Sequence, residues 1–325
     1  MPRTIETTVT AVRMACIGRM TTLAVMALSV WASGCGSLPE HVYRPVTTAY
    51  PQPERTPLGS LVLARRGATR SSSGFALLDS VEPAYTARMA LIAAARHTLD
   101  LQYYAIHADG TTEQMLQALR DAARRGVRVR ILLDDFNTSG RNAQVLRLGF
   151  EPQVELRLFN PLAGSRASML GRIVGSLGSL QRMQQRMHNK LFIADNAMGI
   201  TGGRNLGDSY FGFGQASNFV DLDVLAAGSI VRDMSRSFDQ YWNNSRAYPV
   251  QSLTTLAQLD ALIGDASTSL QDSTSAPMFA PPASGAEITP MEADTVVPDM
   301  QATPAFADVP LNLQRLNLIW APAVL

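Results

Sequence analysis

A histidine and a lysine two residues apart, followed by an aspartate, are the side chains best suited to chemistry in this chain. They are His188, Lys190 and Asp195. In an extended strand, residues two apart point to the same face, so the imidazole and the ammonium are expected to share one site. Such a pair suits attack on a phosphodiester. A neutral imidazole is a nucleophile, and a cation stabilises the charge that develops on the phosphoryl oxygens.

Two glycines and an asparagine follow this group at short range. Gly202 and Gly203 precede Asn205, and the dipeptide Asn196-Ala197 would join two strands, so that Asn205 returns toward the site. The carboxamide would add a second donor to the phosphoryl oxygens. Glycine lets the backbone approach a phosphate closely. The sequence therefore predicts a phosphate-binding site around residues 188–205.

Other polar residues have simpler interpretations. His41, His97 and His107 stand alone, and a lone histidine is usually solvated or satisfied within the fold. Asp134 and Asp135 end a predicted strand, where a parallel sheet often places functional groups. They would either line the cleft or serve as helix caps and solvated loop residues.

Strand-like and helix-like patterns alternate between residues 75 and 246. We expect strands over 98–106, 127–135, 154–160, 188–195, 198–203 and 219–228, and helices over 111–125, 141–148 and 229–243. Strands separated by helices of this length predict an α/β/α sandwich with a mixed, mostly parallel sheet.

The N-terminal residues 1–34 have the features of a secretory signal. Three arginines precede an apolar run of twelve residues, and small residues lead to Cys35. Twelve helical residues are too few to cross a bilayer. Cleavage before Cys35 resembles the lipobox of bacterial lipoproteins, which implies a lipid anchor on Cys35 and a periplasm-facing location in the cell envelope. An ordinary signal peptide is the alternative.

Composition bounds the remaining regions. Of 325 residues, 46% are apolar and 17% charged, which excludes a wholly disordered chain. The net charge of +1 neither favours nor excludes nucleic acid, and two cysteines cannot form a disulfide framework. We expect a proline-rich tether over 35–74, a catalytic domain over 75–246, an acidic and largely disordered segment over 247–310, and an apolar final stretch over 311–325.

The spacing H-x-K-x4-D, followed by Gly-Gly-x-Asn, resembles the signature of the phospholipase D superfamily. The segments LDLQYYAIHAD, GVRVRILLDD and DLDVLAAG are similar to blocks of the bacterial cardiolipin synthase C-type branch, and the resemblance runs from about residue 75 to 244. It implies a phospholipase D-like fold and a phosphohistidine intermediate on His188. Lys190 and Asn205 would hold the phosphoryl oxygens, and Asp195 would position its neighbours.

The resemblance implies further site residues. An acid on the next strand would orient the imidazole, and Asp223 is our first choice over Asp221, which lies on the same face. The expected substrate-binding residues are Gly202, Gly203, Arg204 and Arg186. The chain contains no H-E-x-x-H, C-x-x-C or Walker A motif, so neither a metal nor a cofactor is expected.

A basic stretch precedes the motif. No acid occurs between Glu155 and Asp195, whereas arginines recur there and apolar residues fall at roughly helical spacing. The pattern predicts either an amphipathic segment that leans on an anionic membrane or a surface loop whose arginines extend into water.

Phospholipase D chemistry uses two H-x-K motifs, and this sequence has one. The chain resembles the N-terminal half of a two-motif cardiolipin synthase, so a homodimer or a second half is the expected partner. The function expected is a lipid-anchored phosphatidyltransferase or phosphodiesterase that acts on membrane phospholipids. The alternatives are a single-motif nuclease and a truncated, inactive lipid-binding lipoprotein. Nucleic acid is not the expected partner.

Overall fold

A computed structural model describes the fold for residues 38–66, 72–138, 140–163, 185–214, 218–261, 263, 312–313 and 318–321. The predicted signal with Cys35, most of the basic stretch and residues 264–310 of the acidic segment lie outside these ranges, so the expectations for them stay predictions. The start of that segment is not disordered, because residues 247–249 pair with a strand of the sheet and Val250 and Leu259 are buried. In the parts of the chain that the structure describes, no helix has both the length and the apolar character needed to cross a bilayer.

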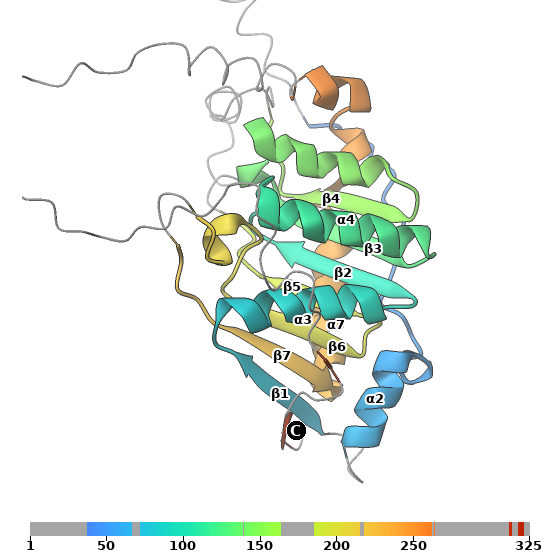
Figure 1. Cartoon of the computed structure of the whole chain (residues 1–325). Helices are drawn as coiled ribbons and strands as arrows, with labels where there is room; N and C mark the ends of the chain where they lie inside the picture. The colour runs from blue at the N-terminus through green and yellow to red at the C-terminus, as the bar shows by residue number, and fades with distance from the viewer. Residues whose placement is uncertain are drawn as a thin grey trace, which may run out of the picture.

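The described strands form one sheet of nine that runs through the domain (Figure 1), in the order β8-β4-β3-β2-β5-β6-β7-β1-β9. The strands are β1 (Ser73–Leu78), β2 (Thr98–Tyr103), β3 (Arg128–Asp134), β4 (Val154–Phe159), β5 (Leu191–Ala194), β6 (Met198–Gly202), β7 (Asp223–Gly228), β8 (Ala247–Pro249) and β9 (Ile319–Ala321). Every strand expected between residues 98 and 228 is present, with shorter ends.

The parallel part of the sheet is confined to β2, β3 and β4. The other pairings among the described strands are antiparallel. The α/β class and the mixed sheet are therefore confirmed, but the expected predominance of parallel pairing is not. Parallel neighbours need a crossover connection. In the middle of the sheet, α4 (Gly110–Arg124) connects β2 to β3. The 3₁₀ segment η3 (Gly140–Phe150) connects β3 to β4.

Helices cover both faces of the sheet (Figure 1). α3 (Val81–Ala94) and α4 lie on one face and α7 (Ser229–Trp242) on the other, each over its own cluster of buried apolar side chains. α4 begins where the Asp109 side chain accepts a hydrogen bond from the Thr112 backbone N–H at 3.3 Å. It ends before Gly126, whose φ of 91° suits glycine. The predicted helices over 111–125 and 229–243 are thus confirmed.

The expectation of a tether over 35–74 is wrong for the described residues. The stretch 38–56, here called the N-terminal strap, is bonded to the domain, and α2 (Pro57–Arg65) and the start of β1 follow it. The Thr47 carbonyl accepts a hydrogen bond from Arg130 at 3.0 Å, and the Thr47 hydroxyl accepts one from the Trp242 indole at 2.9 Å. The Tyr50 ring stacks on His97 with centroids 4.2 Å apart. Proline content alone did not reveal these side-chain partners.

The final apolar stretch contributes a strand to this sheet. β9 pairs antiparallel with β1 and places Trp320 opposite Gly74. A Cβ on Gly74 would lie 3.1 Å from the Trp320 ring, so glycine leaves room for the indole to pack. Residues 319–321 therefore extend the edge of the domain.

Candidate active site

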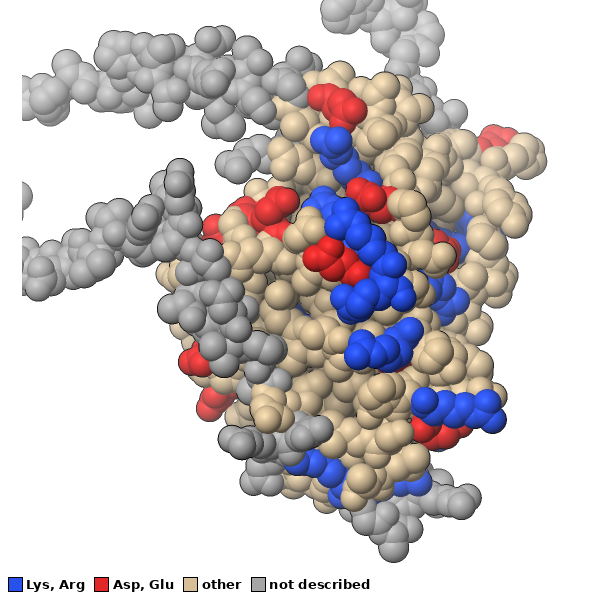
Figure 2. Space-filling view, turned by 45° about the vertical axis from the view of Figure 1, so that its right-hand side comes forward, with Lys and Arg blue, Asp and Glu red and all other residues tan. Residues whose placement is uncertain are grey.

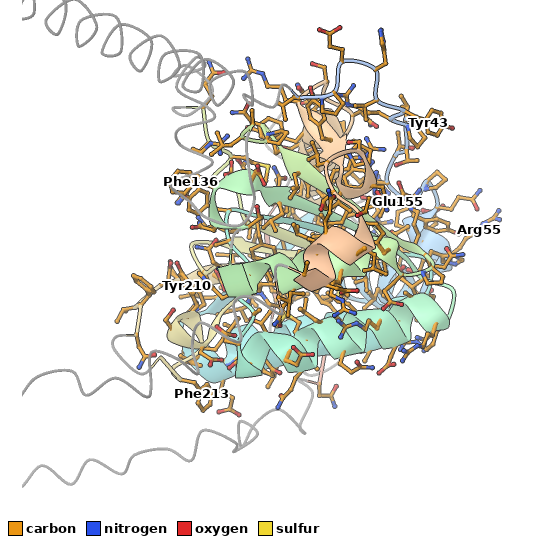
Figure 3. All side chains as sticks on the ribbon, turned by 90° about the horizontal axis from the view of Figure 1, so that it is seen from above. Tyr43, Arg55, Phe136, Glu155, Tyr210 and Phe213 are labelled. Atoms are coloured by element: carbon orange, nitrogen blue, oxygen red, sulfur yellow. The ribbon has the colours of Figure 1, made fainter. Side chains whose placement is uncertain are left out.

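The β5–β6 hairpin presents the histidine and the lysine at one end of the sheet. Lys190 comes directly before β5, whose first residue, Leu191, pairs with Gln102 near the end of β2. His188 therefore lies beside the ends of the parallel strands, the edge where open α/β sheets bind ligands. In Figure 3, Phe136 and Tyr210 mark this side of the molecule, whereas Tyr43 and Arg55 lie on the opposite side.

The predicted pairing of imidazole and ammonium is present. Lys190 Nζ lies 3.0 Å from Nδ1 and 3.2 Å from Nε2 of His188, and it donates to the His188 carbonyl at 2.9 Å. His188 is exposed, whereas Lys190 is buried, with 6% of its surface accessible. The ammonium is thus held by the protein while the ring faces solvent.

The environment of this pair disfavours a second positive charge. The pKa of His188 is lowered, first by desolvation and then by the neighbouring Lys190 ammonium. Partial burial also lowers the pKa of Lys190, and the Asp221 carboxylate opposes that change. A histidine with a pKa below its usual value of 6.5 is mostly neutral at pH 7, so one ring nitrogen is unprotonated and carries the lone pair that attack requires.

Tyr104 is a site residue that the sequence analysis missed. Its ring centroid lies 4.9 Å from that of His188 at an interplanar angle of 53°, and 5.9 Å from Lys190 Nζ. The ring forms one wall beside the nucleophile and presents a face to the ammonium. Its position just after β2 could have indicated this, because β2 runs next to β5.

Asn205 lies at the same edge but is directed elsewhere. Its Oδ1 accepts a hydrogen bond from the Ala105 N–H at 3.2 Å, and its Nδ2 donates to the Tyr210 hydroxyl at 2.9 Å. Tyr210 in turn stacks on Phe219, with centroids 4.7 Å apart. The carboxamide therefore holds the segment after β6 against the segment after β2, and the role of phosphoryl ligand expected for it stays a prediction.

The choice of Asp223 as the acid that orients His188 is not supported by its contacts. Asp223 is buried and forms ion pairs with Arg88 at 2.9 Å and with Arg204 at 3.5 Å. Asp221, our second choice, is the acid whose charge acts on Lys190. Two residues that are two positions apart on one strand would point to the same face. These acids do not, because Asp223 is the first residue of β7 whereas Asp221 lies before the strand.

The two glycines make room for these acids. A Cβ on Gly202 would lie 2.1 Å from Oδ1 of Asp223, and one on Gly203 would lie 1.9 Å from Oδ1 of Asp221. Glycine is needed at position 202, where a Cβ would also collide with the backbone of Leu222 and Asp223; at position 203 it would displace only the Asp221 carboxylate. The expected approach of this backbone to a phosphate stays a prediction.

The two arginines expected to bind substrate are occupied by the protein itself. Arg204 is buried, and its guanidinium contacts Asp223 and donates to the Leu78 carbonyl at 3.3 Å. Arg186 pairs with Asp134 at 3.2 Å and donates to the Asn160 carbonyl at 2.6 Å. Arg204 is therefore corrected to a core residue, and Arg186 to one that holds the chain before His188.

Asp195 lies at the far end of β5 from the nucleophile. Its carboxylate accepts hydrogen bonds from the backbone N–H groups of Arg96, His97 and Thr98 at 2.7–3.2 Å. These contacts fix the start of β2, and β5 separates them from His188. Asp195 therefore joins β2 to the hairpin, which agrees with the expectation that it positions its neighbours; the catalytic role given to it stays a prediction.

Replacing Asp195 with alanine is expected to lower the free energy of unfolding by about 3 kcal/mol, because buried N–H groups lose their acceptor. Urea denaturation measures the change. Turnover per folded molecule should stay close to wild type, since the carboxylate does not touch the His188–Lys190 pair. A folded variant without turnover would instead support a catalytic role for Asp195.

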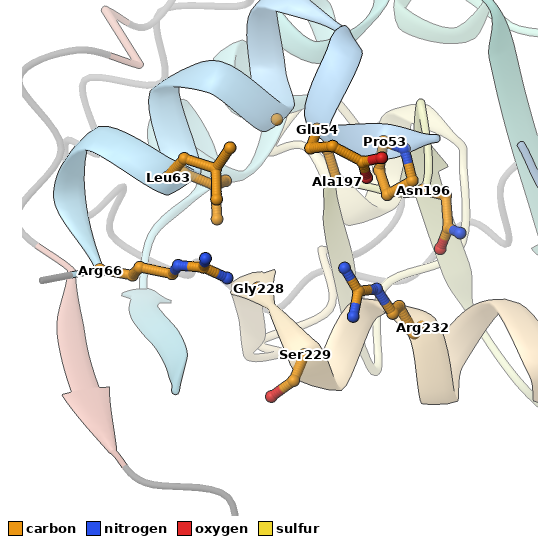
Figure 4. Close-up of a pocket in the computed structure, with 11 residues that line it drawn as sticks. Pro53, Glu54, Leu63, Arg66, Asn196, Ala197, Gly228, Ser229 and Arg232 are labelled. Carbon is orange, nitrogen blue, oxygen red and sulfur yellow. The ribbon is translucent and has the colours of Figure 1, made fainter. Parts of the chain in front are cut away.

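Other pockets and clusters do not add to this site. A small pocket between the N-terminal strap, α2, the β5–β6 turn and the start of α7 contains none of the site residues (Figure 4). Within the described ranges, no three His, Cys, Asp or Glu side chains gather as a metal site would require.

Comparison with known proteins identifies relatives of this domain. Residues 89–242 match the family model described as cardiolipin synthase, PLD-like domain. Cardiolipin synthase C of Escherichia coli is 40% identical over 196 residues, which cover 60% of this chain and 41% of that protein. An uncharacterized protein of Helicobacter pylori is 35% identical over 230 residues, covering 70% of this chain and 45% of that one.

Among solved structures, NucT from Helicobacter pylori aligns with a TM-score of 0.40 at 15% identity, over 55% of this chain and 98% of NucT. The chain spans less than half the length of the two curated relatives above. The family model and the identity to cardiolipin synthase C agree with the motif and with the domain that carries it. Residues 89–242 therefore form a PLD-like domain of the kind found in cardiolipin synthases.

Proposed function

We propose that this chain is one half of a phosphatidyltransferase or phosphodiesterase that acts on membrane phospholipids. One observation carries the proposal. The exposed His188 imidazole, with its lowered pKa, lies 3.0–3.2 Å from a buried ammonium at the ligand-binding edge of the sheet. The likeness to cardiolipin synthases supports a phospholipid as the substrate class.

The reaction proceeds in two displacements. The unprotonated ring nitrogen of His188 attacks phosphorus, the ester P–O bond breaks, and the alcohol leaves with a proton, so that a phosphatidyl-histidine forms. An acceptor hydroxyl, or water, then attacks the same phosphorus, loses its proton and releases the imidazole. Lys190 stabilises the charge on the phosphoryl oxygens in both steps.

The first displacement needs a proton donor for the leaving alkoxide. Lys190 stabilises charge on the phosphoryl oxygens, so the donor must be another group. A second imidazole, from another copy of this chain or from a separate second half, fills that role in the proposed enzyme. In a homodimer a two-fold axis would bring the same surface of each protomer together. The lipid anchor on Cys35 and the location in the cell envelope belong to the same proposal, because an anchored enzyme stays at its substrate.

Two arginines of α4 are paired with acids, which disfavours nucleic acid as a partner of this helix. Figure 2 shows Lys and Arg side chains with Asp and Glu interspersed among them. Arg120 lies 3.8 Å from Glu113 and 4.0 Å from Glu151, and Arg124 pairs with Asp121 at 2.8 Å. Proteins bind the phosphates of nucleic acids with Lys and Arg side chains that replace the counterions of those phosphates. Arginines already paired with acids suit that purpose poorly.

The full chain should convert phosphatidylglycerol in mixed vesicles and leave plasmid DNA intact when the same preparation is assayed on both. Rates per milligram should rise with protein concentration, because the active species contains two histidine motifs. DNA cleavage without lipid turnover would replace the proposal with a nuclease. Vesicle binding without turnover of either substrate, at all concentrations, would exclude the homodimer; if a separately supplied second half also restored no turnover, the proposal would give way to an inactive lipid-binding protein.

A further inference from the structure

The carboxylate that ends β3 faces the stretch of chain that leads into the nucleophile. Asp134 is fully buried. Its Oδ2 accepts a hydrogen bond from the Met187 N–H at 2.8 Å, and its Oδ1 pairs with the Arg186 guanidinium at 3.2 Å. Oδ1 also accepts from the Phe136 N–H at 2.9 Å. Two of its three partners are therefore the residues directly before His188.

This stretch has no regular secondary structure that would otherwise fix it. Residues 185–190 lie outside any helix or strand. Besides Asp134, the end of β4 holds them. Asn160 Nδ2 donates to the Gln185 carbonyl at 2.7 Å, and the Asn160 carbonyl accepts from Arg186 at 2.6 Å. The buried Met187 side chain belongs to the apolar cluster between the sheet and α7. The ends of β3 and β4 thus fix three consecutive residues before the imidazole.

We propose that Asp134 is a positioning residue for His188, acting through the Met187 N–H and the Arg186 guanidinium. This inference rests on the proposed function, in which His188 attacks phosphorus. Asp134 does not reach the reacting atoms. Its ionised carboxylate has the acceptor sites for both donors, whereas the protonated acid has fewer and attracts Arg186 less.

The charges around Asp134 make the contact sensitive to pH. Arg186 and the N–H donors stabilise its ionised form, whereas burial and the neighbouring Asp135 oppose it; burial dominates and raises the pKa of Asp134 to about 6. Tyr104 follows the end of β2, and burial first, then the Asp134 charge, raise the pKa of its phenol. Because the folded pKa exceeds the usual value near 3.9, the ionised carboxylate lowers the stability of the fold at neutral pH. A charge retained at that cost fits a role in the site better than a role in folding.

Asp135 provides a matched control. It is equally buried, but its carboxylate accepts hydrogen bonds from the Leu162 N–H at 2.8 Å and the Thr138 hydroxyl at 2.6 Å. The Asp134→Asn and Asp135→Asn variants therefore each remove one buried charge at the end of β3. Only the first alters the carboxylate that accepts from the Met187 N–H and pairs with Arg186: the carboxamide keeps one acceptor oxygen but loses the second oxygen and the charge.

In the full chain assayed on phosphatidylglycerol vesicles, Asp134→Asn should lower kcat by about 10²-fold, the effect expected of a misplaced reactive group, with KM close to wild type. The wild-type rate should fall below pH 6 on a limb to which both Asp134 and His188 contribute. That limb should become shallower in Asp134→Asn and keep its slope in Asp135→Asn. Equal losses in both variants, or an unchanged slope, would overturn the inference.

A measurement on the wild-type chain needs neither turnover nor a variant. After correction for intrinsic rates, hydrogen exchange at the Met187 amide should accelerate as the pH falls below about 6. Met187 exchange without a step near pH 6 would contradict the role of Asp134. If Met187 exchange accelerates below pH 6 but the chain turns over no lipid, the contact between Asp134 and Met187 is supported and only the proposed function is contradicted.

Discussion

The His188→Ala variant is expected to lose phosphodiester turnover, by a factor on the order of 10⁶, as when a nucleophile is removed from other covalent enzymes. The loss follows from the role of the imidazole, because no other described side chain offers a neutral nucleophile beside Lys190. Turnover of phosphatidylglycerol in vesicles measures the effect. The fold should be unchanged, since the His188 ring is exposed.

His97→Ala is the control for this variant. His97 is also exposed, but it stacks on Tyr50 of the N-terminal strap, at the other end of the sheet from the site. This substitution should leave turnover per folded molecule close to wild type. Comparable activity in His188→Ala and wild type would remove His188 from the mechanism.

Replacing Asp223 with alanine should lower the free energy of unfolding by about 3–5 kcal/mol, the cost of breaking a buried ion pair by removing one partner. Arg88 and Arg204 would both remain buried without their carboxylate. Arg88 also bonds the Tyr103 hydroxyl at 3.2 Å, so the loss would extend to the end of β2. Urea denaturation followed by circular dichroism measures the change.

Asp221→Ala serves as the matched variant, because it removes an acid two residues away on the same segment. Its side chain is partly exposed, and within the described residues it accepts a hydrogen bond from the neighbouring Leu222 N–H at 2.8 Å. Its cost in stability should therefore be about 0.5 kcal/mol or less. It should instead lower the pKa of Lys190, whose charge it supports. Equal destabilisation by the two substitutions would contradict the division of roles between these acids.

Local patterns sufficed to predict most elements and the central pair of the site. Residues 110–124 form a helix because buried apolar side chains recur at helical spacing between an aspartate cap and a glycine. His188 and Lys190 meet because they flank one residue just before a strand. In both cases the information lies within a few neighbouring residues.

The failed predictions concern contacts between distant segments. Asp223 and Asp221 share a strand face in the sequence pattern. The ion pairs of Asp223 with Arg88, 135 positions away, and with Arg204 show that Asp223 belongs to the core. Asp195 matches the motif, but the spacing did not reveal that it binds backbone groups of residues 96–98. The N-terminal strap was predicted as a tether because its partners, such as Arg130 and Trp242, lie far along the chain. Spacing within a motif does not report such partners.

The pairing within the sheet failed for a related reason. Alternating strand and helix patterns predict parallel neighbours, but β5, β6 and β7 follow one another without a crossover helix between them. β1 then pairs with β7 across about 150 residues of chain. The order of elements was readable from the sequence, whereas the neighbour of each strand was not.

The covalent intermediate offers the most direct test of the central claim, that His188 attacks the phosphorus of a phospholipid. The full chain would be mixed with phosphatidylglycerol vesicles, quenched with alkaline denaturant to protect an acid-labile phosphoramidate bond, digested and analysed by mass spectrometry. We expect the peptide with residues 187–190 to carry a phosphatidyl group on His188, and the His188→Ala chain to carry none. Lipid turnover with the adduct on another residue would contradict the account.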